Sequence, residues 1–290
     1  MLGSMKNLPL RPLKEQSSFR RIAAVAWPEP RDPHVYGALE VRAEKLEAWI
    51  EGVRKKSGEK ITVTHAVTRA VAMVMARHRD LNALVRFGRL ELRRDIDIFL
   101  QVSVEDEGKK AAKADLSGVK ISRAETKDVV AIATEIRERA AKIRARQDPD
   151  FERTKSLLTT LPGVLLRPML AFVDFLSYTL NISPAFLGTA PDPFGGIMVT
   201  NVGVFGLTRG WAPFFPLARA SMIVTLGTIE RKPVVEGDEI KIGRVLYVNG
   251  TFDHRIIDGY QAALVARELK DYLENPEKLE GEAMAPAQDP

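Results

Sequence analysis

The residues most able to do chemistry lie near the C-terminal end, in the run Asp253-His254-Arg255-Ile256-Ile257-Asp258-Gly259. An imidazole titrates close to neutral pH, so the His254 ring is suited to accept a proton from a substrate. A general base also needs a fixed orientation, and Asp253, Arg255 and Asp258 are placed to hold the local backbone through ion pairs. The run therefore predicts a histidine general base.

The surroundings of this run decide between two interpretations. It follows an apolar, strand-like segment, Val245 to Val248, and precedes a segment of helical periodicity, Tyr260 to Leu273. In the alternative interpretation Asp253, Arg255 and Asp258 form a surface ion-pair cluster, and the histidine is incidental. The position of the whole run on a strand-to-helix turn favours the catalytic interpretation.

Other segments are predicted to form the helices and strands that position this turn. Helices are expected from about Thr62 to Val74 and from Val129 to Ile143, because apolar residues recur there at helical spacing. The expected strands are His34 to Val41, Leu81 to Phe87, Glu91 to Leu92, Ile96 to Val104, Ile197 to Asn201, Ser221 to Leu226 and Val245 to Val248. Helices and strands are mixed throughout, so the expected class is α/β or α+β with a mixed sheet.

Five segments, taken together, carry a family resemblance. They are Arg20-Arg21-Ile22-Ala23, Asp32-Pro33-His34-Val35-Tyr36, Thr200-Asn201-Val202-Gly203-Val204-Phe205-Gly206, Leu226-Gly227 with Arg231-Lys232-Pro233-Val234-Val235, and the Asp253 to Gly259 run. In this order they resemble the catalytic domain of the dihydrolipoamide acyltransferases of 2-oxoacid dehydrogenase complexes. That family shares a fold with chloramphenicol acetyltransferase, and the Asp253 to Gly259 run resembles its active-site signature.

The resemblance implies a role for each matching position. His254 would be the general base, and Thr200, in the place of a family serine, would donate to the oxyanion. Asp258 would make a structural ion pair with Arg20 or Arg21. Asp253, Arg255, Gly259 and Asn201 would support the site. The fold would be chloramphenicol-acetyltransferase-like, with the active site between subunits of a trimer.

The implied function is acyl transfer between coenzyme A and a thiol or hydroxyl acceptor by direct attack. Coenzyme A or an acyl-CoA is expected as substrate, with no metal. The expected partners are further copies of the chain, as a homotrimer or higher assembly, and a lipoyl-bearing protein or other 2-oxoacid dehydrogenase subunits. The alternative is a non-catalytic trimeric scaffold or core subunit of such a complex.

Three departures from the family pattern stand out. The sequence contains no lipoyl-bearing domain, so no lipoyl group is expected on this chain. The family's apolar, proline-containing channel segment is replaced by Glu105-Asp106-Glu107-Gly108-Lys109-Lys110-Ala111-Ala112-Lys113. Lys109, Lys110 and Lys113 are candidates for contacts with CoA phosphates, although a solvated loop is the simpler interpretation. Residues 150–195 enlarge a link that is short in the family.

The expected organisation is one catalytic domain over residues 18–280, with an N-terminal arm at 1–17 and a disordered tail at 281–290. Within the 150–195 insertion, residues 155–190 are the most apolar part of the chain, interrupted by prolines. They predict a helical hairpin packed on protein. A peripheral membrane contact through residues 155–182 is the alternative, because the apolar stretch is too broken to span a bilayer.

Composition excludes several other functions. The chain of 290 residues has no cysteine and four histidines, which excludes disulfides, thiolate catalysis and thiolate metal sites. The net charge of +5 comes from interleaved acidic and basic residues, without the long cationic tract expected for nucleic-acid binding. Neither a P-loop nor a G-x-S-x-G elbow is present. No signal peptide is recognisable, and a cytoplasmic location is expected.

Overall fold

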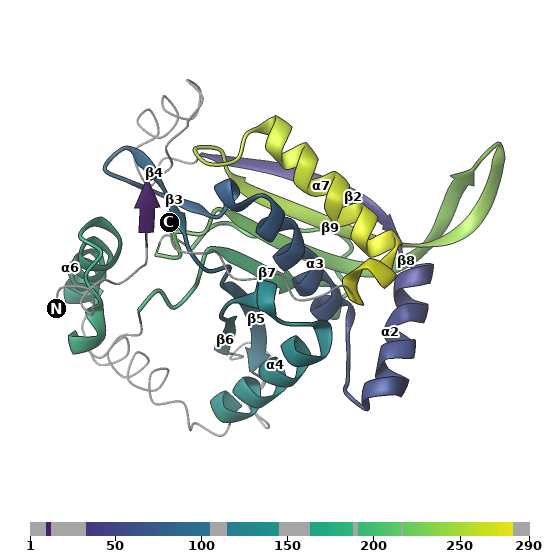
Figure 1. The fold of residues 1–290 in the computed structure, drawn as a ribbon, viewed down its shortest axis with the longest axis horizontal. Coiled ribbons are helices and arrows are strands. Elements are labelled where there is room, and N and C mark those ends of the chain that lie inside the picture. Colours follow the sequence, from purple (N-terminus) through teal and green to yellow (C-terminus); the bar gives the residue numbers. More distant parts are fainter. Residues whose placement is uncertain are drawn as a thin grey trace.

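The computed structural model describes the greater part of the chain: residues 10–12, 33–104, 115–144, 163–187, 191–215 and 217–280. Its main feature is a mixed six-stranded sheet with helices on one face (Figure 1). The strand order is β2 (His34–Arg42), β9 (Glu239–Asp253), β8 (Met222–Glu236), β7 (Ile197–Asn201), β5 (Ile98–Val104) and β6 (Asp115–Ile121). Strand β7 runs parallel to β5 and β8, and the remaining neighbours are antiparallel. The α/β class predicted from the sequence is confirmed.

The helices pack on the sheet through an apolar layer. They are α2 (Glu44–Ser57), α3 (Val63–Arg77), α4 (Val129–Arg144) and α7 (Gly259–Glu274). Alternate strand residues such as Val199, Val224 and Val248 enter this core, because successive side chains of a strand point to opposite faces. Thr200 and Gln101 therefore belong to the opposite face of the sheet, which these helices do not cover.

Helix α3 lies closest to the centre of this layer and contacts β7. A capping box starts it: the Thr62 side chain accepts from the backbone of His65, and His65 Nδ1 accepts from the Thr62 N–H. Burial lowers the pKa of His65 to about 4, so its ring stays neutral and can accept this hydrogen bond. The cap fixes the first turn of α3, where Thr64 meets the end of β7.

The strands β8 and β9 are much longer than the predicted apolar runs Ser221 to Leu226 and Val245 to Val248. Beyond Ile229 and Leu246 they continue as a two-stranded hairpin that projects from the sheet (Figure 1). The apolar side chains of Val235, Ile240 and Ile242 on this projection are exposed. Half of residues 230–245 are charged, so this projection lacks the continuous apolar run that marks a buried strand.

A second sheet of three strands lies beside the first, in the order β1 (Leu10–Pro12), β4 (Arg89–Arg93) and β3 (Ala83–Arg86). Helix α6 (Gly163–Asp174) lies at this end of the molecule (Figure 1). It continues into one π-helical turn, Phe175–Thr179. The other half of the predicted helical hairpin lies outside the described residues. Within the described residues, none of the helices combines the length and apolar character that crossing a bilayer requires.

Candidate active site

The turn that carries His254 joins β9 to α7, and we refer to residues 253–258 as the histidine turn. Its backbone is held at both sides. The His254 N–H donates to the Pro33 carbonyl at 2.8 Å, which ties the turn to the start of β2. The N–H groups of Ile256 and Ile257 both donate to the Asp253 carbonyl at 2.9 Å. The turn is therefore tight and anchored to a neighbouring strand.

A buried ion pair fixes the first half of the histidine turn. Arg255 donates from Nε to Asp253 Oδ1 at 2.9 Å and from Nη2 to Oδ2 at 2.6 Å, and its backbone N–H also donates to Oδ1 at 3.0 Å. Asp253 is 5% exposed and Arg255 is 8% exposed. This burial contradicts the alternative of a surface ion-pair cluster. A two-pronged arginine–carboxylate contact sets the orientation of both side chains, so it stiffens the backbone on either side of His254.

The imidazole of His254 has one nitrogen committed to the protein. Its Nδ1 lies 2.9 Å from the carbonyl oxygen of Ile257. A carbonyl oxygen can only accept, so in the neutral ring Nδ1 carries the hydrogen and Nε2 keeps its lone pair. The turn thus selects the tautomer in which Nε2 can remove a proton.

Asp258 starts helix α7 as its N-cap. Its Oδ1 accepts from the N–H of Gln261 at 3.0 Å, and Gln261 Oε1 accepts from the N–H of Asp258 at 2.9 Å. This reciprocal pair satisfies backbone groups that a helix start leaves open. Arg20 and Arg21, the expected ion-pair partners of Asp258, lie outside the described residues. Gly259 is exposed, and among the described residues no atom apart from those of its own chain neighbourhood lies within 4 Å of where its Cβ would be, so these residues do not demand glycine there.

The second group of candidate residues lies at the end of β7. Thr200 is partly exposed, and its hydroxyl donates to Gln101 Oε1 on β5 at 3.1 Å. Sequence reasoning did not single out Gln101. The alternation along Ile98–Val104 is the signal that could have found it, because Ile98 and Leu100 are buried and Gln101 must face the same side as Thr200.

Asn201 turns toward the helices. Its Nδ2 donates to the Thr64 hydroxyl at 3.0 Å, which connects the end of β7 to the start of α3. Its Oδ1 is buried, and the described residues offer it no hydrogen-bond partner. The asparagine therefore fixes where β7 ends and, with it, the position of Thr200 one residue earlier.

Glycines allow the chain after Thr200 to cross over β8. A Cβ on Gly203 would lie 2.5 Å from the backbone of Gly227, and a Cβ on Gly227 would lie 1.7 Å from the carbonyl oxygen of Thr208. Atoms at such distances clash, so only glycine permits this approach. The crossing brings the Gly203 motif and the Gly227 motif of the sequence together. They form one structural unit, through which the chain leads away from Thr200.

Thr200 and His254 of one chain do not meet. Thr200 pairs with Thr225 on β8, whereas Asp253, beside His254, donates its N–H to the Ser221 carbonyl. The four positions from Ser221 to Thr225 correspond to about 13 Å along the strand, and crossing from β7 to β9 adds two strand spacings of about 4.8 Å. The hydroxyl and the imidazole of a single chain are thus well beyond hydrogen-bonding distance.

A loop with three aromatic residues, Trp211, Phe214 and Phe215, packs on the face of the sheet opposite the helices. Trp211 Nε1 donates to the Gly37 carbonyl at 3.0 Å. The ring of Phe214 lies 5.0 Å from that of His34, and Phe215 contacts Phe194 at 5.4 Å between ring centroids. The aromatic rings of this loop therefore pack against other side chains of the protein. The channel candidates Lys109, Lys110 and Lys113 lie outside the described residues.

Comparison with protein families identifies one match. A sequence model described as 2-oxoacid dehydrogenases acyltransferase (catalytic domain) matches residues 18–157 and 194–280. The stretch between the two matched segments falls inside the predicted insertion of residues 150–195.

Two curated relatives illustrate the similarity in sequence. The dihydrolipoyllysine-residue acetyltransferase component of the pyruvate dehydrogenase complex of Zymomonas mobilis is 26% identical over 265 residues, which cover 90% of this chain and 49% of that protein. The corresponding component of the acetoin cleaving system of Bacillus subtilis is 25% identical over 227 residues, covering 78% and 44%. The chain spans about half the length of these relatives.

Solved structures share the fold. A probable dihydrolipoamide acetyltransferase from Listeria monocytogenes gives a TM-score of 0.61 at 19% identity, covering 96% of this chain and 98% of that one. The cubic core of the pyruvate dehydrogenase multienzyme complex gives 0.62 at 19%, covering 92% and 93%. The dihydrolipoamide acetyltransferase of Azotobacter vinelandii, studied for the catalytic roles of a serine, a histidine and an asparagine, gives 0.62 at 18%, covering 93% and 98%. At these identities the likeness shows the fold alone.

Proposed function

The chain belongs to the family of 2-oxoacid dehydrogenase acyltransferase catalytic domains, and we propose that it transfers an acyl group between coenzyme A and a thiol or hydroxyl acceptor. The observation that carries the proposal is the His254 ring. Its Nδ1 hydrogen-bonds to the Ile257 carbonyl, which makes Nε2 the basic nitrogen of the neutral ring and orients the ring on an anchored turn. A general base needs a basic nitrogen in a fixed orientation.

The proposed reaction needs no covalent enzyme intermediate. His254 Nε2 removes the proton from the acceptor thiol or hydroxyl as the acceptor attacks the thioester carbonyl of the acyl-CoA. The carbonyl oxygen becomes an oxyanion, which the Thr200 hydroxyl stabilises by donating a hydrogen bond; such donors contribute about 3–4 kcal/mol of barrier lowering. The tetrahedral intermediate then expels the CoA sulfur, which takes the proton back from the imidazolium.

The two catalytic groups would come from different copies of the chain. Within one chain they are separated by about four residues along β8 and by two strand spacings across the sheet, while the partly exposed Thr200 hydroxyl lies on the face of the sheet that the described helices leave uncovered. A closed homotrimer would bring His254 of one copy to Thr200 of the next and repeat the contact at each interface. We also propose that such trimers can associate into larger assemblies.

The relatives support the choice of donor and acceptor. Those found are acetyl- and succinyltransferases that act on dihydrolipoyllysine residues. By analogy, the acceptor or donor proposed here is a lipoyl group on another protein of a 2-oxoacid dehydrogenase complex. The Azotobacter vinelandii enzyme was studied through its serine, histidine and asparagine. The positions proposed here carry a threonine, a histidine and an aspartate, which keep a hydroxyl, an imidazole and a side-chain oxygen.

Mixing two inactive variants tests the shared site. His254→Ala and Thr200→Ala are purified separately, unfolded and refolded together in equal amounts, and assayed with acetyl-CoA and dihydrolipoamide. In randomly mixed trimers about a quarter of the interfaces combine an intact His254 with an intact Thr200. Activity near this fraction of wild type is expected. Mixed trimers without recovered activity would contradict a site between chains.

The scaffold interpretation remains the second candidate, because one structural relative is the core of a multienzyme complex. It predicts normal assembly without turnover. A wild-type protein that forms trimers but neither binds acetyl-CoA in calorimetric titration nor transfers its acetyl group would favour the scaffold over the enzyme.

A further inference from the structure

The end of helix α6 is joined to the core by an ion pair far apart in sequence. Asp174, the last residue of α6, accepts from Arg219 twice, with Nε to Oδ1 at 3.1 Å and Nη2 to Oδ2 at 2.5 Å. The two side chains are only 18% and 16% exposed. Arg219 lies in the segment leading into β8. Helix α6 belongs to the insertion that the family model does not match.

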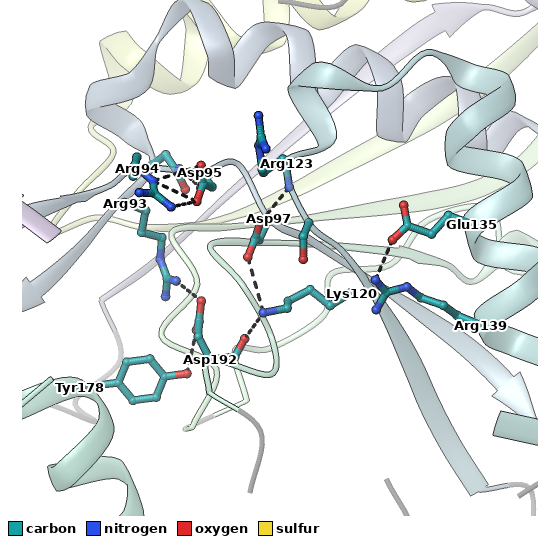
Figure 2. A network of polar contacts seen from close by, with 12 residues as sticks. Arg93, Arg94, Asp95, Asp97, Lys120, Arg123, Glu135, Arg139, Tyr178 and Asp192 are labelled. Carbon is teal, nitrogen blue, oxygen red and sulfur yellow. Dashed lines mark hydrogen bonds and ion pairs between the residues drawn. The ribbon is translucent and has the colours of Figure 1, made fainter. Parts of the chain in front are cut away.

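A second polar contact anchors the following π-helical turn. The Tyr178 hydroxyl donates to Asp192 Oδ1 at 2.9 Å, and Arg93 forms a fully buried ion pair with Asp192 (Figure 2). Lys120 adds a hydrogen bond to the Asp192 carbonyl at 2.8 Å (Figure 2). Burial and the neighbouring Asp192 charge raise the pKa of Tyr178 well above its ordinary value, so its hydroxyl remains a donor. The insertion is thus docked firmly rather than loosely attached.

Arg219 lies next to the histidine turn. The chain reaches Ser221 two residues later, and the Ser221 carbonyl accepts the N–H of Asp253 at 3.0 Å. Arg219 itself has a left-handed backbone with φ of 46°, which a non-glycine residue adopts at a cost. Arg93 Nη2 donates to its carbonyl at 3.3 Å. The surrounding contacts hold Arg219 in this conformation and so direct its side chain.

Four charged residues meet in this region, and we call Asp174, Arg219, Asp253 and Arg255 the charge quartet. The pKa of Arg219 is lowered to about 10, first by burial and then by the positive charge of Arg255, while Asp253 acts in the opposite direction. The two ion pairs are also joined through the backbone, because the N–H of Asp253 donates to the carbonyl of Ser221, two residues after Arg219. Two carboxylates balance two guanidinium groups, and removal of Asp174 would leave an excess buried positive charge beside the histidine turn.

We infer that Asp174 and Arg219 are positioning residues for His254: the insertion holds the Asp253–Arg255 pair and, through it, the orientation of the catalytic imidazole. This inference rests on the proposed function for its kinetic consequence. Its structural consequence, the fixed tautomer of His254, can be measured without turnover. The insertion would then be part of the catalytic apparatus, supplied from a region outside the match to the family model.

The test compares Asp174→Asn with Glu91→Gln in the full chain. Glu91 makes a similarly buried ion pair with Arg86, whose Nη1 donates to both carboxylate oxygens; the side chains of Glu91 and Arg86 are 16% and 21% exposed, and Arg86 also donates to the Thr179 carbonyl of the insertion. Each variant removes one carboxylate charge next to the insertion, but only Asp174 belongs to the charge quartet. Readouts are kcat and KM for acetyl-CoA with dihydrolipoamide, and the imidazole ¹⁵N chemical shifts of His254, one of four histidines.

For Asp174→Asn we expect kcat to fall about tenfold with KM nearly unchanged, since small misplacements of a catalytic group cost rate rather than binding. Its ¹⁵N shifts should show mixed tautomers, while Glu91→Gln keeps the wild-type shifts and kcat. Equal behaviour of the two variants, or wild-type shifts in a folded Asp174→Asn, would overturn the inference.

A wild type without turnover would refute the proposed function. The imidazole ¹⁵N shifts of Asp174→Asn would then still test whether Asp174 positions His254. If Asp174→Asn does not fold, Arg219→Lys replaces it, because lysine keeps the charge without the two-pronged contact.

Discussion

The two halves of the candidate site are built in opposite ways. Most of the histidine turn is buried, and its own chain holds it through the Asp253–Arg255 pair and the hydrogen bond between the His254 ring and Ile257. Thr200 lies on the face of the sheet opposite the helices, and within the described part of the chain its hydroxyl hydrogen-bonds to the exposed side chain of Gln101. In the proposed mechanism the base is oriented within its own chain, whereas the proposed oxyanion donor would depend on a neighbouring copy to exclude water from it.

The largest effect is expected for His254→Ala. Positioned general bases contribute about 10²–10⁴-fold to rates, and turnover of acetyl-CoA with dihydrolipoamide should fall by that factor. Binding of acetyl-CoA, followed by calorimetry, should change little, because the ring acts on the acceptor proton. Turnover unaffected by this substitution would remove the histidine from the mechanism and with it the contrast between the two halves.

Asp253→Asn tests whether the rigidity of the histidine turn comes from the buried ion pair. Removing one partner leaves Arg255 charged and buried, which costs about 3–5 kcal/mol in the free energy of unfolding. Chemical denaturation gives this value directly. The matched control is Glu47→Gln, which breaks the more exposed pair with Arg244 and should cost about 1 kcal/mol or less. Equal costs would mean that burial does not distinguish the histidine turn.

Thr200→Ala should lower kcat by about 10²–10³, the range for loss of one oxyanion donor. Its unfolding free energy should stay close to wild type, because the hydroxyl is partly exposed. Thr200→Ser restores the donor without the methyl group and should retain kcat. If the serine variant loses as much activity as the alanine variant, the hydroxyl is not the group that matters.

The smallest effect is expected at Asp258. Asp258→Ala removes the N-cap of α7 and should cost about 1 kcal/mol of stability. Asp258→Asn keeps a capping oxygen but loses the charge. Thermal denaturation of the two variants therefore separates the role of Asp258 as N-cap from its expected role in an ion pair. A loss confined to alanine indicates a cap, while an equal loss in asparagine supports the expected ion pair with Arg20 or Arg21.

Local sequence patterns were sufficient for much of the fold. Strand β7 begins and ends where the apolar run Ile197 to Asn201 predicts, and α3 and α7 follow their periodic apolar residues to within a few positions. Each of these elements buries one face, and the periodic spacing of apolar residues in the sequence reflects that burial. The projecting part of β8 and β9 buries little and was missed. Strand β6 was also missed; it lies at the edge of the sheet, and its apolar residues are interrupted by Ser117, Gly118 and Lys120.

The sequence indicated candidate site residues but not the contacts that connect them. The run around His254 indicated a base, but the bond to the Ile257 carbonyl depends on the path of a six-residue turn. The predicted support by Asp253 and Arg255 agrees with their ion pair. The pair between Asp174 and Arg219 joins residues 45 positions apart, and no local spacing indicates such a partner. Tertiary packing alone brings these charges together.

The crossing of the backbone over Gly227 limits how the surroundings of Thr200 can be redesigned. A side-chain collision is often relieved by rotation about χ angles, but this contact is between main-chain atoms, which have no such freedom. An attempt to widen the space for bulkier acyl groups must therefore leave Gly203 and Gly227 untouched. Met198 and Thr225, which share the sheet face of the hydroxyl, are the positions where volume can be removed without displacing it.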